Sequence, residues 1–411
     1  MADGQTPPVL IAGGGIGGLA TALALARVGL ASIVAERRSE WSEAGAGIQL
    51  SPNGVRALTH LGAADSLERA AGRPSEIVVR DAATARLLQR LPLGDWVADR
   101  HGAPYWQVHR RDLQSVLIAQ ATAHPLISLI RGFEAVSVVD DGRGVRLEAR
   151  DGRSLGGRLL VGADGVFSTV RQQLFAPAPP RFSGRTAART VVAAPASAEA
   201  RAILTNTATG VWLAPGSHVV HYPVRAGTEI AVVVVRTEPW AAHGWSEPAA
   251  AAEIEAGLKQ VAPAFAAALG TGHSWRRWAL FETEPLAHWS TDRATLVGDA
   301  AHATLPFLAQ GGSLALEDAV TLAACLARAS ESGAEPAALA AYEAARTGRC
   351  RRVVSAARRN GVIFHLSGPG AIARNLVMRT VPGARVMAGY DWVYGWRPPV
   401  EDVTRASPRS A

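Results

Sequence analysis

The segment 298–318 holds residues that could take part in redox chemistry. Asp299 follows a short apolar run, Ala294 to Val297, which predicts that its carboxylate lies at the carboxyl end of a strand. Gln310-Gly311-Gly312 then opens an apolar-periodic segment, which we predict to be a helix. The free N–H groups and partial positive charge of a helix start favour a ligand that becomes anionic when reduced. A flavin is such a ligand, so this segment indicates a redox enzyme.

A second group of candidate residues lies near the N-terminus. Gly13, Gly15 and Gly18 have the spacing GxGxxG, and Glu36 follows them along the chain. Such glycines permit a tight turn, close approach of the backbone to a pyrophosphate, and close helix–strand packing, while the carboxylate can accept hydrogen bonds from ribose hydroxyls. Together they predict dinucleotide binding, without choosing between FAD and NAD.

A third motif lies between the other two. The segment 162–171 reads Gly-Ala-Asp-Gly-Val-Phe-Ser-Thr-Val-Arg, with Asp164 directly after the apolar run Leu159 to Val161. Asp-Gly alone is a common turn, but its place between two cofactor motifs favours a functional interpretation.

The elements that must position these residues alternate between strand and helix. A strand at Val9 to Ala12, a helix at Leu19 to Val28 and a strand at Ser32 to Ala35 make one βαβ unit. Further expected elements are helices at Pro52 to Leu61 (capped by Ser51 or Asn53) and Arg111 to Thr122, an antiparallel insertion at Ile127 to Leu160, strands across Thr186 to Arg236, helices at Ala249 to Leu258 and Ala262 to Leu269, and a helical stretch from Gly312 to Arg359.

Composition excludes several classes of protein. The chain has 411 residues, of which 48% are hydrophobic and 19% charged, and no run approaches the length of a membrane-spanning helix. The net charge of +7 comes from scattered arginines, which argues against nucleic acid. Cys325 and Cys350 have no metal-ligand spacing, so we expect structural thiols and no metal. Without a basic flank and apolar core at the N-terminus, the cytoplasm is the expected location.

The three motifs in this order resemble the group A flavoprotein aromatic hydroxylases, the family of para-hydroxybenzoate, salicylate and 3-hydroxybenzoate hydroxylases. The resemblance runs from Val9 to about Ala324. It implies bound FAD, O2, and NADH or NADPH as a transient co-substrate that visits a groove. It also implies that the following residues bind cofactor: Gly13, Gly15, Gly18, Glu36, Arg37, Gly47, Gln49, Arg110, Asp164, Asp299, Gly311 and Gly312. One departure is that Ala309 precedes Gln310 and Leu314 stands where the family often has a polar residue.

The resemblance implies an α/β (α+β) fold, in which a Rossmann-type FAD-binding domain is interleaved with a β-sheet substrate domain and followed by a C-terminal helical region. We expect residues 1–180 to form the FAD-binding domain, with part of the substrate side near 70–105. The substrate sheet then covers 181–285, the chain returns to the FAD-binding domain over 286–330, the helical region covers 331–400, and 401–411 is a disordered tail.

The catalytic candidates are His218 and Tyr222, four residues apart in a predicted strand. Their side chains share one face of about 13 Å, because strand side chains alternate. The pair resembles that of 3-hydroxybenzoate 6-hydroxylase and 6-hydroxynicotinate 3-monooxygenase. A neutral histidine is a natural base or hydrogen-bond acceptor for a phenol; the alternative is that both residues are structural. Pro306, beside the expected flavin loop, would help shape the substrate pocket.

The predicted activity is therefore insertion of one oxygen atom from O2 into the ring of a phenolic aromatic acid, with 3-hydroxybenzoate 6-hydroxylation to gentisate as first choice. Salicylate 1-hydroxylation and 6-hydroxynicotinate 3-monooxygenation are the nearest alternatives. A flavin dehydrogenase without oxygen insertion and a non-catalytic flavin-binding protein are rivals from other classes. We expect a small aromatic partner, no membrane association and a possible homodimer.

Overall fold

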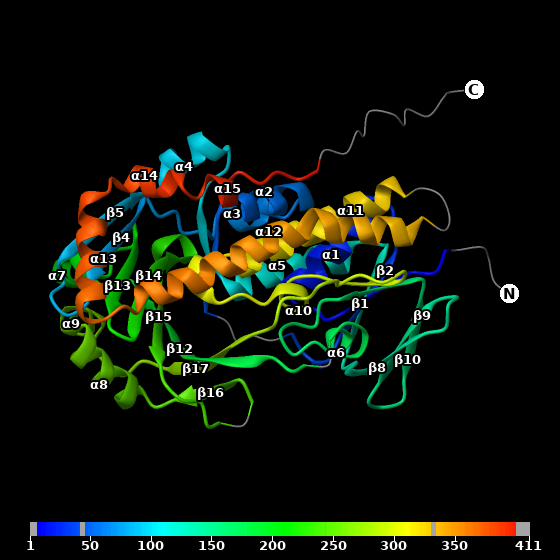
Figure 1. The fold of residues 1–411 in the computed structure, drawn as a ribbon, viewed down its shortest axis with the longest axis horizontal. Coiled ribbons are helices and arrows are strands. Elements are labelled where there is room, and N and C mark those ends of the chain that lie inside the picture. The colour runs from blue at the N-terminus through cyan, green and yellow to red at the C-terminus, as the bar shows by residue number, and fades with distance from the viewer. Residues whose placement is uncertain (1–5, 42–45, 177, 243, 330–333, 400–411) are drawn as a thin grey trace.

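The computed structural model describes residues 6–41, 46–176, 178–242, 244–329 and 334–399. The tail predicted at 401–411 lies outside the described residues. Two units stand side by side along the long axis of the molecule (Figure 1), each built around its own sheet.

The first unit is built on a five-stranded parallel sheet with the order β18-β11-β1-β2-β7. Its strands are β1 (Val9–Ala12), β2 (Ser32–Glu36), β7 (Ile127–Arg131), β11 (Leu159–Gly162) and β18 (Ala294–Leu296). Strands β1 and β11 are buried at every position, as expected for a parallel sheet covered on both faces. The edge strand β18 follows all the strands of the second sheet in sequence. The first unit is therefore formed by two separate segments of the chain.

The antiparallel insertion is smaller than the sequence predicts. Only β8 (Ala135–Asp140), β9 (Val145–Ala149) and β10 (Ser154–Gly157) form an antiparallel sheet. The ends of the predicted segment, β7 and β11, pair in parallel with β2 and β1. Both ends are short apolar runs, whose type of pairing is decided by tertiary neighbours that a local pattern does not reveal.

The second unit is an eight-stranded mixed sheet with the order β16-β17-β12-β15-β14-β13-β4-β5. Its strands are β4 (Glu76–Asp81), β5 (Leu87–Pro92), β12 (Arg181–Ala193), β13 (Thr209–Ala214), β14 (Ser217–Val224), β15 (Glu229–Thr237), β16 (Ser246–Ala249) and β17 (Trp275–Glu282). Helices α8 (Ala251–Val261) and α9 (Pro263–Leu269) pack on one face of this sheet, through Ile254, Leu258 and Phe265. The opposite face is directed toward the first unit.

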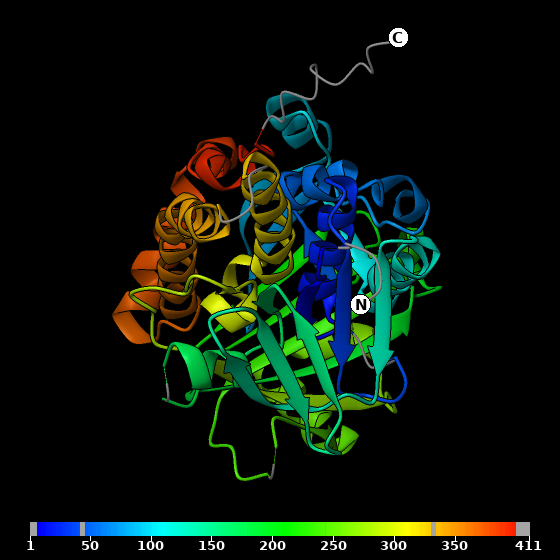
Figure 2. The ribbon, with the colours of Figure 1, turned by 90° about the vertical axis from the view of Figure 1, so that its right-hand side faces the viewer.

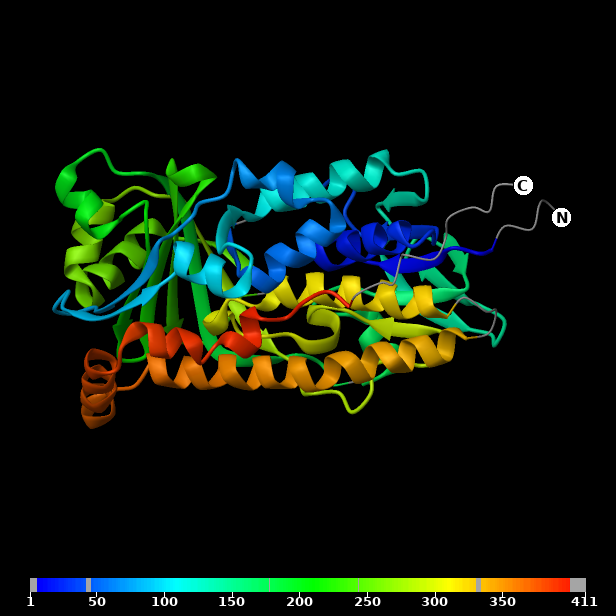
Figure 3. The same ribbon diagram turned by 90° about the horizontal axis from the view of Figure 1, so that it is seen from above.

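Long helices join the two units. Helix α11 (Gly311–Arg328) packs against α1 (Ile16–Arg27) and α2 (Pro52–Leu61). Helix α12 (Glu335–Phe364) lies beside α11 and runs from the first unit to the edge of the second sheet (Figures 1 and 3). Its carboxyl end therefore brings His365 to β14, 147 residues away in sequence.

A small ribbon and shorter helices complete the fold. Strands β3 (Gly47–Leu50) and β6 (Trp106–His109) form a two-stranded antiparallel sheet, and Figure 2 shows the parallel sheet with its covering helices from the side. The remaining helices are α3 (Ala64–Glu68), α4 (Gly94–His101), α5 (Arg110–Ala123), α6 (Thr169–Leu174), α7 (Ala198–Ile203), α10 (Asp299–His302), α13 (Gly368–Thr380), α14 (Gly383–Ala388) and α15 (Asp391–Tyr394). Among the described residues, no helix is both long and apolar enough to cross a bilayer.

Candidate active site

The GxGxxG turn connects β1 to α1 and leaves room for a ligand. Gly13 has φ +109°, and Gly18 lies so close to the turn that an added Cβ would be 1.9 Å from the Gly13 carbonyl oxygen. At Gly15, by contrast, an added Cβ would meet nothing within 4 Å. Gly15 is the N-cap of α1, whose first turn has neither a side-chain cap nor an acidic residue. Free N–H groups beside open space are what a pyrophosphate requires.

Glu36, the last residue of β2, is hydrogen-bonded to this turn. Its Oε2 accepts a hydrogen bond from the Gly14 N–H at 2.8 Å, and its Oε1 accepts one from the Arg38 N–H at 3.0 Å. Each carboxylate oxygen keeps a further lone pair for a ribose hydroxyl. Arg37 is exposed beside it.

Asp164 lies in the turn between β11 and α6, next to the GxGxxG turn. A Cβ added to Gly13 would be 2.5 Å from the Ala163 carbonyl oxygen, so the first and second motifs are in contact. The Asp164 carboxylate accepts hydrogen bonds from the Ser168 hydroxyl and from the Val170 N–H at 3.2 Å. The pKa of this carboxyl is raised, because the effect of burial is larger than the opposite effect of these hydrogen bonds. Its oxygens therefore hold the shape of the turn.

Asp299 and Arg110 present charges toward the same space from opposite sides. Asp299 begins α10 after β18, Arg110 begins α5 after β6, and both side chains are exposed. They are close enough for each charge to affect the ionisation of the other. The start of α11 at Gly311 lies nearby, because a Cβ there would be 3.9 Å from Asp299 Oδ1.

The first turn of α11 has no side-chain cap and no acidic residue. A Cβ on Gly312 would lie 2.6 Å from Ile48 Cδ1, which brings this helix start against strand β3. Pro306, in the turn that precedes α11, is exposed. The structure thus places Asp299, Arg110 and the α11 start around one region, as the sequence predicts.

Strand β3 carries Gly47 and Gln49 toward the second sheet. Gln49 Oε1 accepts a hydrogen bond from the Tyr105 hydroxyl at 2.7 Å. A Cβ on Gly47 would lie 2.4 Å from Tyr222 Cε2, so the Tyr222 ring packs directly on the Gly47 backbone.

A buried polar network fixes the loop before α11. Gln310 donates to Ser51 Oγ at 2.8 Å and accepts from Asn53 Nδ2 at 2.9 Å, while Asn53 also donates to Glu317 at 2.6 Å. Ser51 is the N-cap residue of α2, as predicted, but its side chain makes no capping hydrogen bond, because it is bonded to Asn53 and Gln310.

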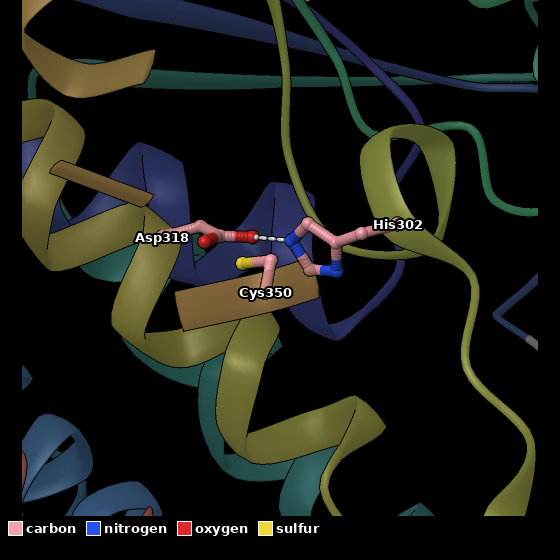
Figure 4. Close-up of side chains that lie close together, drawn as sticks. All are labelled: His302, Asp318 and Cys350. Atoms are coloured by element: carbon pink, nitrogen blue, oxygen red, sulfur yellow. Dashed lines mark hydrogen bonds and ion pairs between the residues drawn. The ribbon is translucent and has the colours of Figure 1, made fainter. Parts of the chain in front are cut away.

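His302, Asp318 and Cys350 lie together behind this loop (Figure 4), with one potential ligand atom from each within 4.8 Å of the others. The Asp318 carboxylate accepts from His302 Nε2 at 2.6 Å, from the Gly298 N–H at 2.8 Å and from Arg346 Nε at 2.7 Å. With three donors on Asp318 and a guanidinium beside it, this cluster is an ion-pair network that fits a cation poorly. It ties segment 298–302 to α11 and α12, in agreement with a structural role for His302.

His218 lies at the end of a chain of three hydrogen-bonded side chains. Arg185 Nε donates to His365 Nδ1 at 3.1 Å, and His365 Nε2 lies 2.8 Å from His218 Nδ1. Burial, followed by the neighbouring charges, lowers the pKa of His365 to about 4 and that of His218 well below 6.5, so both rings are neutral at pH 7. Because an arginine can only donate, His365 carries its proton on Nε2 and donates it to His218 Nδ1. Neutral His218 therefore carries its own proton on Nε2.

Tyr222 shares the face of β14 with His218 but lies against different neighbours. His218 packs on Phe307 and Phe364, with ring centroids 5.5 and 5.4 Å apart, whereas Tyr222 packs on Gly47. His221 points to the opposite face, onto Phe265 of α9. The alternation predicted for this strand is thus observed, with the two candidate side chains at separate ends of one surface.

Comparison with known proteins identifies the cofactor. A family model described as FAD binding domain matches residues 6–357. The chain belongs to this FAD-binding family. The open space at Gly15, the bonded Glu36 and the uncapped start of α11 all fit FAD, whose pyrophosphate would be held at α1 and whose ring would lie near α11.

Two relatives agree on the type of enzyme, and a solved structure shares the fold and contains FAD. The chain is 35% identical over 393 residues to a 3-hydroxybenzoate 6-hydroxylase of Polaromonas naphthalenivorans, covering 95% of this chain and 96% of the relative. It is 38% identical to a 3-amino-4-hydroxybenzoate 2-monooxygenase of Streptomyces platensis, covering 95% and 96%. The crystal structure of Klebsiella pneumoniae HpxO with FAD and uric acid superposes with a TM-score of 0.82 at 28% identity, over 93% of this chain and 95% of that one. The protein is an FAD-dependent monooxygenase.

Several residues of this monooxygenase site were not predicted from the sequence. His365 and Asp318 are brought to it by helices α12 and α11, and no local motif marks them. Arg185 and Arg189 stand four apart on β12 and so share a face, but Arg185 lies just before the predicted strand region, which begins at Thr186. The roles expected of His218, Tyr222 and the cofactor-binding residues stay predictions.

Proposed function

We propose that this monooxygenase hydroxylates the ring of an aromatic acid that carries a phenolic hydroxyl, with 3-hydroxybenzoate converted to gentisate as the first choice. The observation that carries this proposal is the surface of β14, where the neutral His218 and Tyr222 flank an apolar floor opposite the flavin loop. The relative named as a 3-hydroxybenzoate 6-hydroxylase supports this choice of substrate. Salicylate and 6-hydroxynicotinate are alternatives.

A second candidate reaction is 2-hydroxylation of 3-amino-4-hydroxybenzoate. It is supported by the relative of that name, which is 38% identical over nearly the whole chain. Both substrates are benzoates with an electron-donating phenol, so the same surface would serve either.

In the mechanism that we derive, His218 stabilises negative charge on the phenolic oxygen. Its Nε2–H is the free donor, because Nδ1 is occupied by His365. A donor at this oxygen favours the phenolate, which makes the ring a better nucleophile. Once bound and reduced by NADH or NADPH, FAD supplies activated O2, from which one oxygen atom passes to the ring.

Tyr222 is placed to orient the substrate rather than to exchange its proton. Burial raises the pKa of its phenol to about 12, so it stays protonated at neutral pH and acts as a donor. Its ring packs on Gly47. A substrate bound to the Tyr222 hydroxyl would therefore have a fixed position relative to the cofactor loop. Apolar side chains from the turn before α11, Leu305 and Phe307, pack on Ala187 and Val235 and keep water from the site.

The test is a panel of phenolic acids with the purified holoenzyme. NADH and NADPH oxidation and O2 uptake are measured for 3-hydroxybenzoate, 3-amino-4-hydroxybenzoate, salicylate and 6-hydroxynicotinate, and products are identified by mass spectrometry. We expect stimulated oxidation with gentisate as product from 3-hydroxybenzoate. Hydride transfer with no hydroxylated product from any acid would indicate a dehydrogenase instead. Absence of flavin reduction with every acid and both donors would indicate a non-catalytic flavin-binding protein.

The division of the chain into domains at 1–180, 181–285, 286–330 and 331–400, a homodimeric state and a cytoplasmic location remain predictions from the sequence.

A further inference from the structure

Arg189 is a half-buried arginine that makes no hydrogen bond or ion pair to the described residues. It lies on β12, its Nε is buried and makes no hydrogen bond, and no carboxylate pairs with it in the described part of the chain. Its guanidinium carbon lies 5.2 Å from the centre of the Trp278 ring. Other arginines of this sheet are paired, as Arg181 is with Glu282 and Arg277 with Glu247.

A guanidinium whose Nε is buried and makes no hydrogen bond is energetically unfavourable. Burial lowers its pKa, and the nearby positive charge of Arg110 lowers it further. Burying a charge without a partner costs free energy, which an anion bound beside it would offset. A carboxylate bound beside Arg189 would therefore supply the partner that the described residues do not provide.

The position of Arg189 relates it to both catalytic candidates. In the sheet register, Arg189 stands opposite Val233, and Val233 stands opposite Val220, which lies midway between His218 and Tyr222. Two strand spacings, about 10 Å, separate β12 from β14, and the three strands lie side by side in Figure 1. All these side chains share one face. Arg110, whose positive charge lowers the pKa of Arg189, also lies within electrostatic reach of it.

A cavity adjoins the guanidinium. It has a volume of about 320 Å³ and is lined by Arg189, Trp278, Val191, His109 and Ala46, among others. This volume is at the lower end of the range for small-molecule sites, about 300–1,000 Å³. Ala46 directly precedes the Gly47 backbone on which Tyr222 rests, so the cavity reaches the expected flavin loop.

We propose that Arg189 binds the carboxylate of the aromatic substrate. This inference rests on the proposed function and names the residue that anchors the acid. A guanidinium binds a carboxylate through two parallel hydrogen bonds, which fixes direction as well as position. The ring would then lie over Val233 and Val220, with its phenolic oxygen toward the β14 side chains. Arg189 would therefore select acids over neutral phenols.

The variants Arg189→Met and Arg189→Lys test this assignment. Met keeps the length and apolar contacts and removes the charge, whereas Lys keeps the charge and loses the planar pair of donors. Arg181→Met is the matched control, because it removes an exposed arginine from the same strand and the same charge from the protein. Binding is followed by the change in flavin absorbance on titration with 3-hydroxybenzoate and with uncharged 3-hydroxybenzamide, and steady-state KM values are measured for the acid and for NADH and NADPH.

We expect Arg189→Met to weaken binding of the acid by about 10- to 150-fold, since hydrogen bonds to charged groups are lost. Lys should be intermediate, and the amide, the nicotinamide donors and FAD content should be unaffected. The melting temperature of Arg189→Met should equal or exceed that of the wild type, since the variant removes a half-buried charge that has no anionic partner among the described residues. A merely structural arginine would instead lower it.

Three results would overturn the inference. Equal weakening of acid and amide would show that Arg189 only shapes the pocket. A rise confined to the KM of the nicotinamide donor would assign Arg189 to that donor's phosphates. Unchanged binding of the acid would leave Arg189 without this role, even where gentisate is formed. Conversely, Arg189-dependent binding of a different aromatic acid, with no product from 3-hydroxybenzoate, would sustain the inference and contradict the proposed substrate.

Discussion

His365 donates from Nε2 to Nδ1 of His218, 2.8 Å away, and so determines which nitrogen of His218 carries the proton. The direction of this bond is set by Arg185, whose Nε–H occupies the other nitrogen of His365. A histidine whose proton is fixed on Nε2 is a donor there and would have to become charged to accept a proton. The low pKa that burial gives His218 opposes that charge. The relationship thus favours stabilisation of a phenolate over removal of its proton.

Replacing His365 with Leu should reduce catalysis without loss of cofactor. His218 would then be free to adopt either tautomer, and its Nε2 would lack a proton part of the time. We expect kcat/KM to fall about 10-fold, or 1.4 kcal/mol, with less hydroxylated product for each NADH or NADPH oxidised. Arg185→Met should show the same uncoupling, whereas His288→Leu, at an exposed position, should not. Full coupling in both test variants would return His218 to a structural role.

Replacing Tyr222 with Phe should separate its hydroxyl from its packing. The ring would still cover Gly47, so FAD should remain bound. Loss of one donor should raise the KM for the acid about 10-fold. Because the Tyr222 pKa is about 12, any activity transition between pH 7 and 10 should be unchanged in the variant. A transition that disappears in Tyr222→Phe would show that this tyrosine titrates.

Gly15 allows cofactor binding to be tested apart from folding. A Val side chain there would begin in space free of protein atoms within 4 Å of its Cβ, so the fold should tolerate it. It would occupy the approach to the start of α1, and we expect FAD affinity to fall at least about tenfold, or 1.4 kcal/mol. Gly156→Val is the control, since its added Cβ also meets nothing and Gly156 lies on β10, outside the cofactor turn. Flavin content and circular dichroism after purification give the result.

The sequence was most informative where function depends on local backbone shape. The turn at Gly13 and Gly15 and the start of α11 were predicted at their observed places, because a glycine turn and a helix start are encoded by neighbouring residues, whereas Gly18 lies inside α1, which begins at Ile16 and not at Leu19. The alternation of His218 and Tyr222 on one face follows equally from strand geometry.

Residues that depend on tertiary packing were not predictable in this way. His365 contacts His218 only because α12 spans both units. The relation of Arg189 to the candidate residues on β14 follows only from the order of the strands, which places β12 two strands from β14. The same limit explains the antiparallel insertion, where β7 and β11 joined the parallel sheet.

Asp318→Asn should destabilise the whole cofactor side of the protein. The carboxylate balances both His302 and Arg346 in a buried position, at 2.6 and 2.7 Å. Burial opposes charge on His302, but Cys350 and Asp318 outweigh it and raise its pKa. Removing one partner of a buried ion pair costs about 3–5 kcal/mol. Urea unfolding of the apo and FAD-bound protein measures this loss, and a change below 1 kcal/mol would contradict the assigned network.

The two buried histidines of β14, His218 and His221, predict acid sensitivity, and His221 allows this effect to be measured apart from catalysis. His221 points away from the site, packs on Phe265, and has its pKa lowered to about 3, mainly by burial and then by Arg80. In the unfolded chain its pKa returns to about 6.5, so between these values the unfolded state binds the proton that the folded state excludes. The stability that neutral His221 permits is therefore complete above pH 6.5 and is lost as the pH falls toward 3. His221→Leu should remove up to about 1.4 kcal/mol per pH unit from the slope of unfolding free energy between pH 6 and 4. Urea unfolding at several pH values checks this, and a slope equal to that of the wild type would mean that His221 is protonated in the folded protein.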